Sequence, residues 1–210
     1  MGKIFYILGK SSTGKDTVYK RILHDKSLGL NSVVLYTTRP IRDGEVPDVT
    51  YHFVDEETFL KLQKENRIIE DRAYQTMHGL WRYFTVNDTE LDLKHKDYLI
   101  IGVLQSFLSI RDYFGKENVI PIYIEVYDGV RLQRALDREK KPENHKYTEM
   151  CRRYLADTED FAEEKLAAAG IDRRFVNDDL ERCIREIRTY IGGIRDGYES
   201  QSNDDGERTC

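Results

Sequence analysis

The chain is poor in several residue types and patterns, and their absence excludes whole classes of protein. It has 3 cysteines in 210 residues, without a Cys-x-x-Cys pair, and its 5 histidines show no metal-ligand spacing. This usage fits a reducing compartment and predicts neither a disulfide framework nor a zinc site. No apolar run approaches a membrane span, and the N-terminal residues show no signal-peptide pattern. We therefore expect a cytoplasmic protein with no membrane partner.

A basic surface is also missing. Lys and Arg number 33 against 38 Asp and Glu, which gives a net charge of −5 and argues against nucleic acid as a partner. Charged residues make up 34% of the chain, as expected for a soluble protein. A length of 210 residues suits one α/β domain with small inserted subdomains. Composition leaves both a monomer and a homodimer open.

The strongest motif lies in residues 9–17. The apolar run 4–8 predicts a buried parallel strand, and Val18 and Ile22 share one face of a following helix. Between them, residues 9–15 read Gly-x-x-x-x-Gly-Lys, the pattern of a phosphate-binding P-loop. The glycines let successive N–H groups and the helix dipole face an anion, and the lysine reaches the β/γ oxygens. We predict a nucleotide-phosphate site formed by Gly9, Lys10, Ser11, Ser12, Thr13, Gly14, Lys15, Asp16 and Thr17.

One position of this motif bears on the metal. Asp16 follows the lysine where a Ser or Thr would ligate Mg²⁺, and Thr17 comes one place later. The apolar strand predicted over 98–104 carries no acidic residue that could help. Phosphate oxygens and waters can supply most Mg²⁺ ligands, so we predict that Thr17 or Asp16 adds the protein contact.

A second group of phosphate ligands is predicted in the loop 37–45, which carries Pro40 and an Asp-Gly pair. Arg39 and Arg42, three residues apart, can converge on one phosphate with their planar donor forks. Residues 32–36 and 51–54 read as strands, Asp55 as a helix N-cap, and Glu70 ends an apolar stretch. The aromatic run 74–84 fits either core packing or the wall of a base pocket.

These motifs, in this order, resemble the guanylate kinase family: Thr-Thr-Arg-x-x-Arg-x-Gly-Glu over 37–45, Tyr-x-Phe-Val over 51–54, then an apolar pair and Glu70. The resemblance implies a P-loop NTPase three-layer α/β sandwich with a parallel sheet, a small NMP-binding subdomain and a helical lid. By the same resemblance, the ligands of GMP are Arg39, Arg42, Tyr51, Glu70 and His78. Chemistry supports Glu70, because a carboxylate can accept from the adjacent N1–H and N2–H₂ of guanine.

The second half extends the resemblance. A helix over 131–138, a polar loop over 139–146 and a second helix that runs to Gly170 resemble the family's lid, with Arg138 and Arg153 as its best phosphate-contacting arginines. Arg134 and Arg152 remain competitors for that role. The stretch 176–180, Val-Asn-Asp-Asp-Leu, matches a late family motif and implies that Asn177 contacts the adenine of ATP.

The predicted organisation is a core of residues 1–31 and 92–191, an NMP-binding subdomain at about 32–91, a lid at about 137–152 and a disordered tail at 192–210. The resemblance implies transfer of a phosphoryl group from Mg-ATP to GMP, with Lys15, Arg39, Arg138 and Arg153 in catalytic roles. Leu35, Ile101 and Val103 depart from the family pattern, which has a serine and two acids there. Two alternatives therefore stay open: a kinase for another nucleotide or small phosphate acceptor, and a non-catalytic guanylate-kinase-like binding module.

Overall fold

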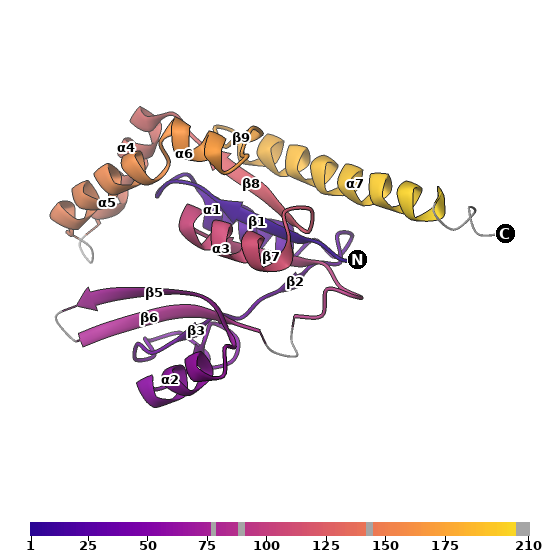
Figure 1. The fold of residues 1–210 in the computed structure, drawn as a ribbon. Coiled ribbons are helices and arrows are strands. Elements are labelled where there is room, and N and C mark those ends of the chain that lie inside the picture. The colour runs from indigo at the N-terminus through magenta and orange to yellow at the C-terminus, as the bar shows by residue number, and fades with distance from the viewer. Residues whose placement is uncertain (77–78, 88–90, 142–144, 205–210) are drawn as a thin grey trace.

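The chain folds around two β-sheets, drawn in Figure 1. The computed structural model describes residues 1–76, 79–87, 91–141 and 145–204. The larger sheet has the strand order β2-β7-β1-β8-β9 and the smaller one the order β4-β3-β6-β5. The strands are β1 (Ile4–Leu8), β2 (Asn31–Ser32), β3 (Tyr36–Thr37), β4 (His52–Phe53), β5 (Ile68–Thr76), β6 (Gly79–Val86), β7 (Tyr98–Gly102), β8 (Val119–Glu125) and β9 (Arg174–Val176).

Every pairing in the larger sheet is parallel, and helices cover both of its faces (Figure 1). The helices of the molecule are α1 (Lys15–Leu23), α2 (Glu56–Lys64), α3 (Leu104–Phe114), α4 (Asp128–Glu139), α5 (Tyr147–Asp160), α6 (Glu163–Ala168) and α7 (Leu180–Asp204). Side chains alternate along β1, so Tyr6 packs in the cluster with α3 and α6, and Ile7 in the one with α1 and α7. The predicted α/β fold with a parallel sheet is confirmed.

The smaller sheet has its own core with α2. Phe59 and Leu62 of α2 pack on Phe84 and Val86 of β6. Asp55 caps α2 as predicted, because its Oδ1 accepts from the backbone N–H of Thr58 at 2.8 Å. The cap joins residues three positions apart, so the sequence alone was enough to predict where this helix begins.

The strand predicted over residues 32–36 is wrong as one element. Asn31 and Ser32 pair with β7 in the larger sheet, whereas Tyr36 and Thr37 pair with β6 in the smaller one. The chain crosses between the two sheets at this point, which β propensity cannot reveal. The strand predicted from residue 98 ends at Gly102, and Leu104 already begins α3.

The lid helices also differ from prediction. The helix predicted over 131–138 begins earlier, at Asp128, and the following one divides into α5 and α6. The break falls where Phe161 leaves the helix to stack on Tyr123 in the core, with ring centroids 5.8 Å apart. Residues 142–144 of the polar loop lie outside the described residues.

Helix α7 contradicts the disordered tail predicted from residue 192, since it continues to Asp204. Ile194 packs against the core, and Arg195 Nη2 lies 2.5 Å from Asp97 Oδ2. The glycines that favoured disorder each cost a helix only about 1 kcal/mol, and this helix is already anchored on the sheet. Within the described part of the chain, no helix has the length and apolar character needed to cross a membrane.

Candidate active site

The loop between β1 and α1 has the tight backbone of a phosphate cradle. A Cβ at Gly9 would lie 2.4 Å from the carbonyl oxygen of Ile124. Gly14 has φ 86°, and a Cβ there would lie 2.5 Å from Asn177 Nδ2. Only glycine fits both positions, so the spacing recognised in the sequence has a steric cause.

Buried hydrogen bonds support this loop from below. Thr13 Oγ1 donates to the carbonyl of Lys10 at 2.9 Å, and Asn177 Nδ2 donates to the carbonyl of Thr13 at 2.7 Å. Arg134 Nη2 in turn donates to the carbonyl of Asn177 at 3.0 Å. Asn177 is 4% exposed, so its amide supports the phosphate loop. Its contact with adenine stays a prediction.

Lys15 and the two predicted metal ligands lie together in the first turn of α1. Lys15 Nζ is 3.9 Å from Asp16 Oδ2, and the Asp16 side chain is 81% exposed. Thr17 is exposed as well. A carboxylate and a hydroxyl are hard oxygen ligands of the kind Mg²⁺ takes, beside the lysine that would face phosphate. Among the described residues no group of three or more His, Cys, Asp or Glu could hold a metal, so phosphate oxygens would have to complete its coordination.

The structure brings both predicted lid arginines to the phosphate loop. Arg138 and Arg153 line a cavity of about 10 Å³ together with Ser11 and Ser12. Ser12 has φ 65°, and its Oγ is buried without a hydrogen-bond partner among the described residues. Two arginines beside the phosphate loop fit an anionic ligand.

The competing arginines are engaged elsewhere. Arg134 supports the loop through Asn177, and Arg152 forms a two-pronged pair with Glu149 at 2.7 and 2.8 Å. Arg153 Nε also donates to Glu149, at 2.7 Å. The hydrogen bonds from Arg152 and then Arg153 lower the pKa of Glu149 to about 2. This carboxylate therefore stays ionised and orients both arginines on α5.

A carboxylate that sequence reasoning missed lies on the phosphate loop. Asp157 Oδ2, from α5, accepts the backbone N–H of Ser11 at 2.8 Å. The same oxygen pairs with Arg131 Nη1 at 3.2 Å, and the fully buried Arg131 also pairs with Asp128. A carboxylate thus accepts from an amide that a phosphate oxygen would use. The only signal in the sequence is the helical spacing of Glu149, Arg153 and Asp157, which puts three charges on one face.

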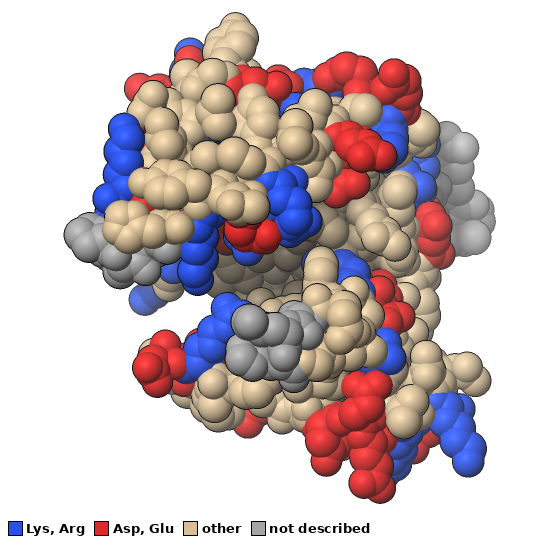
Figure 2. All heavy atoms as spheres, turned by 90° about the vertical axis from the view of Figure 1, so that its left-hand side faces the viewer, with Lys and Arg blue, Asp and Glu red and all other residues tan. Residues whose placement is uncertain are grey.

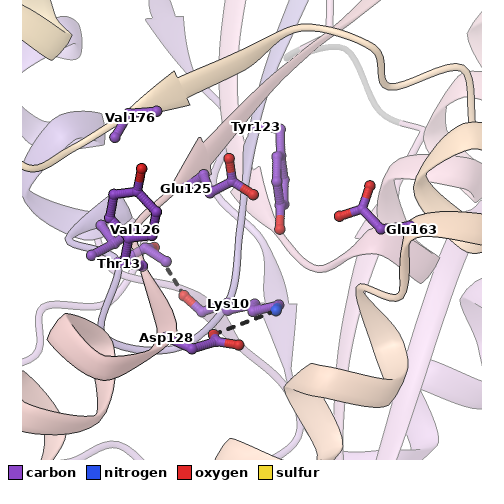
Figure 3. Close-up of a pocket in the computed structure, with 9 residues that line it drawn as sticks. Lys10, Thr13, Tyr123, Glu125, Val126, Asp128, Glu163 and Val176 are labelled. Atoms are coloured by element: carbon purple, nitrogen blue, oxygen red, sulfur yellow. Dashed lines mark hydrogen bonds and ion pairs between the residues drawn. The ribbon is translucent and has the colours of Figure 1, made fainter.

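A larger cavity of about 310 Å³ lies beside the loop and is shown in Figure 3. Lys10 Nζ lies 3.5 Å from Asp128 Oδ1 at its edge. Burial and the neighbouring Glu125 raise the pKa of Tyr123 in its wall to about 12. The charged residues lining it are Lys10, Glu125, Asp128 and Glu163. Arginines pair with these carboxylates, Arg174 with Glu125 at 3.0 Å and with Glu163 at 2.6 Å, and Arg131 with Asp128 at 3.0 Å.

Arg39 is the buried centre of the predicted acceptor site. It is 4% exposed, and its Nη1 donates to Glu45 Oε2 at 2.7 Å and to the carbonyl of Pro40 at 2.9 Å. Its Nη2 donates to Glu45 Oε1, and its Nε to the hydroxyl of Tyr83 at 3.1 Å. A guanidinium has five N–H donors, so these contacts leave one on Nη2. Sequence reasoning quoted Glu45 in the motif but missed this pairing.

Arg42 and Tyr51 lie around the same centre. Arg42 is exposed, with its Cζ 5.7 Å from the Trp81 ring, and its backbone N–H donates to Glu45 at 2.8 Å. The Tyr51 ring lies 5.1 Å from Arg39 Cζ. Hydrogen bonds from Arg39 hold the pKa of Glu45 at about 2, so Glu45 organises the cluster as an anion. His78, the remaining predicted phosphate ligand, lies outside the described residues.

Glu70 lies on β5 with a side chain that is 4% exposed. Thr85 Oγ1 donates to its Oε1 at 2.9 Å, and Arg72 Nε lies 3.3 Å from its Oε2. Sequence reasoning missed both partners. The signal for Arg72 was available, because residues two apart on a strand share a face.

The donor and acceptor groups belong to the two sides of a cleft. Figure 2 shows a hollow between the part of the molecule with α4 and α5 and the part with β5 and β6, with Lys and Arg side chains at its rim. The donor group comprises the loop, Arg138 and Arg153, and the acceptor group is built on the smaller sheet. This arrangement suits two phosphorylated ligands that meet in the cleft.

The parallel sheet, the glycine loop at the start of α1 and the arginine-bearing second sheet define a P-loop α/β protein. The chain belongs to the guanylate kinase family, since the family model described as guanylate kinase matches residues 1–193. The resemblance seen in the motifs is thereby confirmed.

Individual relatives agree with this assignment. A guanylate kinase of Porphyromonas gingivalis is 30% identical over 194 residues, covering 91% of this chain and 97% of the relative. One of Neisseria meningitidis is 44% identical over 199 residues, covering 92% and 89%. The crystal structure of guanylate kinase from Anaplasma phagocytophilum superposes with a TM-score of 0.62 at 20% identity, covering 91% of this chain and 85% of that one. At that identity the structural likeness shows the shared fold.

Proposed function

We propose that the protein is an ATP-dependent guanylate kinase, which transfers the γ-phosphoryl group of Mg-ATP to GMP and yields ADP and GDP. The observation that carries the proposal is the pairing of two anion sites across one cleft. Lys15 and the lid arginines lie on one side, and the cluster around Arg39 and Glu70 on the other. Membership of the guanylate kinase family supports this reaction.

On the donor side, the N–H groups of residues 9–15 and the free hydroxyl of Ser12 would hold the ATP phosphates. Lys15, Arg138 and Arg153 would neutralise charge that develops on the transferring phosphoryl group. Such a transfer depends on positioning and charge neutralisation more than on a base. Asn177 would hold the loop and border the adenine.

On the acceptor side, Arg42, Tyr51 and the remaining Nη2 hydrogen of Arg39 would bind the GMP phosphate, with His78 as a further predicted ligand. Glu70 would accept hydrogen bonds from the guanine edge. A phosphate monoester is already an anionic nucleophile near neutral pH, so no side chain has to remove a proton. The acceptor site therefore acts by aligning the GMP phosphate with the phosphoryl group to be transferred.

The oxygen atoms of the first turn of α1 are ligands of the kind that Mg²⁺ takes. Thr17 and Asp16 would provide oxygen contacts, and the β- and γ-phosphates and waters the rest. The ion would neutralise phosphate charge and make Asp16 tolerable beside a polyanion.

We propose the organisation predicted from the sequence for the moving parts: a core of residues 1–31 and 92–191, an NMP-binding subdomain at about 32–91 and a lid at about 137–152. Closure of the lid would exclude water from the transferring group. For the oligomeric state we propose a monomer or a homodimer. The free thiols of Cys151 and Cys183 fit a cytoplasmic location.

A coupled ADP-release assay with Mg-ATP and a panel of nucleoside monophosphates tests the proposal. We expect turnover with GMP and far less with AMP, CMP or UMP. Turnover with another member of the panel but not with GMP would replace the acceptor and keep the kinase. Nucleotide binding without turnover on any acceptor would favour the non-catalytic binding module.

A further inference from the structure

Arg72 forms a buried pair with the carboxylate predicted to read the base. Its Nε lies 3.3 Å from Glu70 Oε2, and the two side chains are 16% and 4% exposed. Thr85 satisfies the other oxygen of Glu70 from the neighbouring strand. A carboxylate oxygen accepts more than one hydrogen bond, so Glu70 keeps acceptor capacity on both oxygens.

The donors of Arg72 are not used up by this pair. Its Nε is buried and makes no aligned hydrogen bond to any described residue. Burial opposes the charged form, but Glu70 and the surrounding tyrosines outweigh it, so the pKa of Arg72 is raised. Its Nη1 and Nη2 also form no hydrogen bond or ion pair within the described part of the chain, and the side chain is 16% exposed. A ligand that accepts from these donors would stabilise the charged guanidinium.

A tyrosine of the larger sheet lies close to this pair. Tyr6, 1% exposed on β1, is within electrostatic reach of both Glu70 and Arg72, and burial and Glu70 raise its pKa. The Glu70–Arg72 pair therefore places carboxylate acceptors directly beside guanidinium donors.

The donors and acceptors of guanine match the Glu70 carboxylate and the Arg72 guanidinium. Its N1–H and N2–H₂ are donors that suit a carboxylate, whereas O6 and N7 are acceptors that suit an arginine fork. Adenine presents an amine at the place of O6 and would face the guanidinium with the wrong polarity.

We propose that Arg72 is a specificity-determining residue, which donates hydrogen bonds to O6 of the acceptor guanine while Glu70 accepts from N1–H and N2–H₂. The inference rests on the proposed function and assigns to Arg72 a role in binding the base. The competing role is structural, in which Arg72 only holds Glu70 in place.

Three acceptor nucleotides separate the two roles. 6-Thio-GMP weakens the acceptor at O6, and IMP lacks the amine read by Glu70. With the native protein we expect kcat/KM to fall about 10- to 100-fold from GMP to 6-thio-GMP. In Arg72→Ala we expect kcat/KM for GMP to fall to the value for 6-thio-GMP, so that the ratio of the two approaches one. The ratio of kcat/KM for GMP to that for IMP should stay as in the native protein. Arg72→Gln, which keeps a neutral donor, gives intermediate ratios.

Arg82→Ala is the matched control, since Arg82 lies on the same sheet with its own acids, Glu56 and Asp71. It should keep both native ratios. Loss of the IMP preference in Arg72→Ala with an unchanged 6-thio-GMP ratio would overturn the proposal and assign Arg72 the structural role.

Equilibrium binding of the same three nucleotides makes the outcome independent of turnover. Native protein that binds GMP with the expected ratios but does not phosphorylate it would refute the kinase reaction and leave the role of Arg72 intact. Equal affinity of the native protein for GMP and 6-thio-GMP would refute the role of Arg72. Thermal unfolding of each variant establishes that it is folded.

Discussion

At the scale of single residues, the predicted donor site depends on Lys15, whose side chain forms few contacts that stabilise the fold. Within the described residues Lys15 forms one ion pair, in which its Nζ lies 3.9 Å from Oδ2 of the exposed Asp16. Lys15→Ala should therefore fold normally but lower kcat about 100- to 1,000-fold, the loss typical for one charge-stabilising donor. Steady-state kinetics and thermal unfolding measure the two effects.

Lys20→Ala is the control for this change, because Lys20 is exposed on the same helix. Its kinetics should match those of the native protein. A Lys15→Ala enzyme with a kcat within threefold of native would exclude the lysine from the chemistry.

The Arg39–Glu45 pair predicts a pH dependence of stability. Hydrogen bonds from Arg39 lower the pKa of Glu45 from 4.5 to about 2. A carboxyl with a depressed folded-state pKa stabilises the fold above its unfolded pKa and loses that contribution as the pH falls toward the folded one. The free energy of unfolding of the native protein should exceed that of Glu45→Gln most at pH 7.

The difference should shrink between about pH 4.5 and pH 2, as urea denaturation at several pH values would show. The same carboxylate fixes Arg39 and the Arg42 backbone, so Glu45→Gln should also raise the KM for GMP. A stability difference that stays constant down to pH 2 would contradict the assignment.

At the scale of elements, α5 carries one predicted ligand of the donor phosphates, Arg153, and one competitor, Asp157. Asp157 accepts the Ser11 N–H, and a bound phosphate must take its place there. Removing the charge with Asp157→Asn should tighten ATP binding several-fold, since a fixed anion no longer opposes the polyanion. Isothermal titration of ATP measures the change.

Asp160→Asn, an exposed neighbour on the same helix, is the matched control and should bind ATP like the native protein. Weaker binding by Asp157→Asn would show instead that the carboxylate holds the loop in its binding conformation.

The far end of α7 gives a second test at this scale. Ile194 packs in the core, and Arg195 pairs with Asp97, which also accepts the Lys3 backbone N–H at 2.6 Å. A chain that ends after Asp196 should keep the native Tm, whereas one that ends after Ile191 should lose several degrees. Equal Tm values for the two truncated chains would mean that the folded part ends at residue 191, as the sequence predicted.

At the scale of the whole molecule, the two anion sites must approach each other for transfer to occur. The cleft in Figure 2 separates groups on two sheets that have separate cores. We expect a non-hydrolysable ATP analogue and GMP together to reduce the radius of gyration, measured by small-angle scattering, more than either alone. An unchanged radius with both ligands bound would mean that the described arrangement is already closed.

The sequence by itself determined the elements that depend on neighbours in the chain. The apolar run of β1, the glycines at positions 9 and 14, and the Asp55 cap are each explained within a few residues. Their physical causes, namely side-chain alternation, backbone sterics and one hydrogen bond, act over one turn or one strand. The family resemblance followed from the same local motifs.

Only the tertiary structure decided which side chains meet. Ser11 and Asp157 are 146 positions apart, and Thr13 and Asn177 are 164 apart, yet both pairs shape the phosphate loop. The split of residues 32–36 between two sheets and the length of α7 likewise depend on distant packing. Local propensity is a weak energetic preference that such long-range contacts override. The sequence thus determined that a phosphate loop exists, and the fold decided what surrounds it.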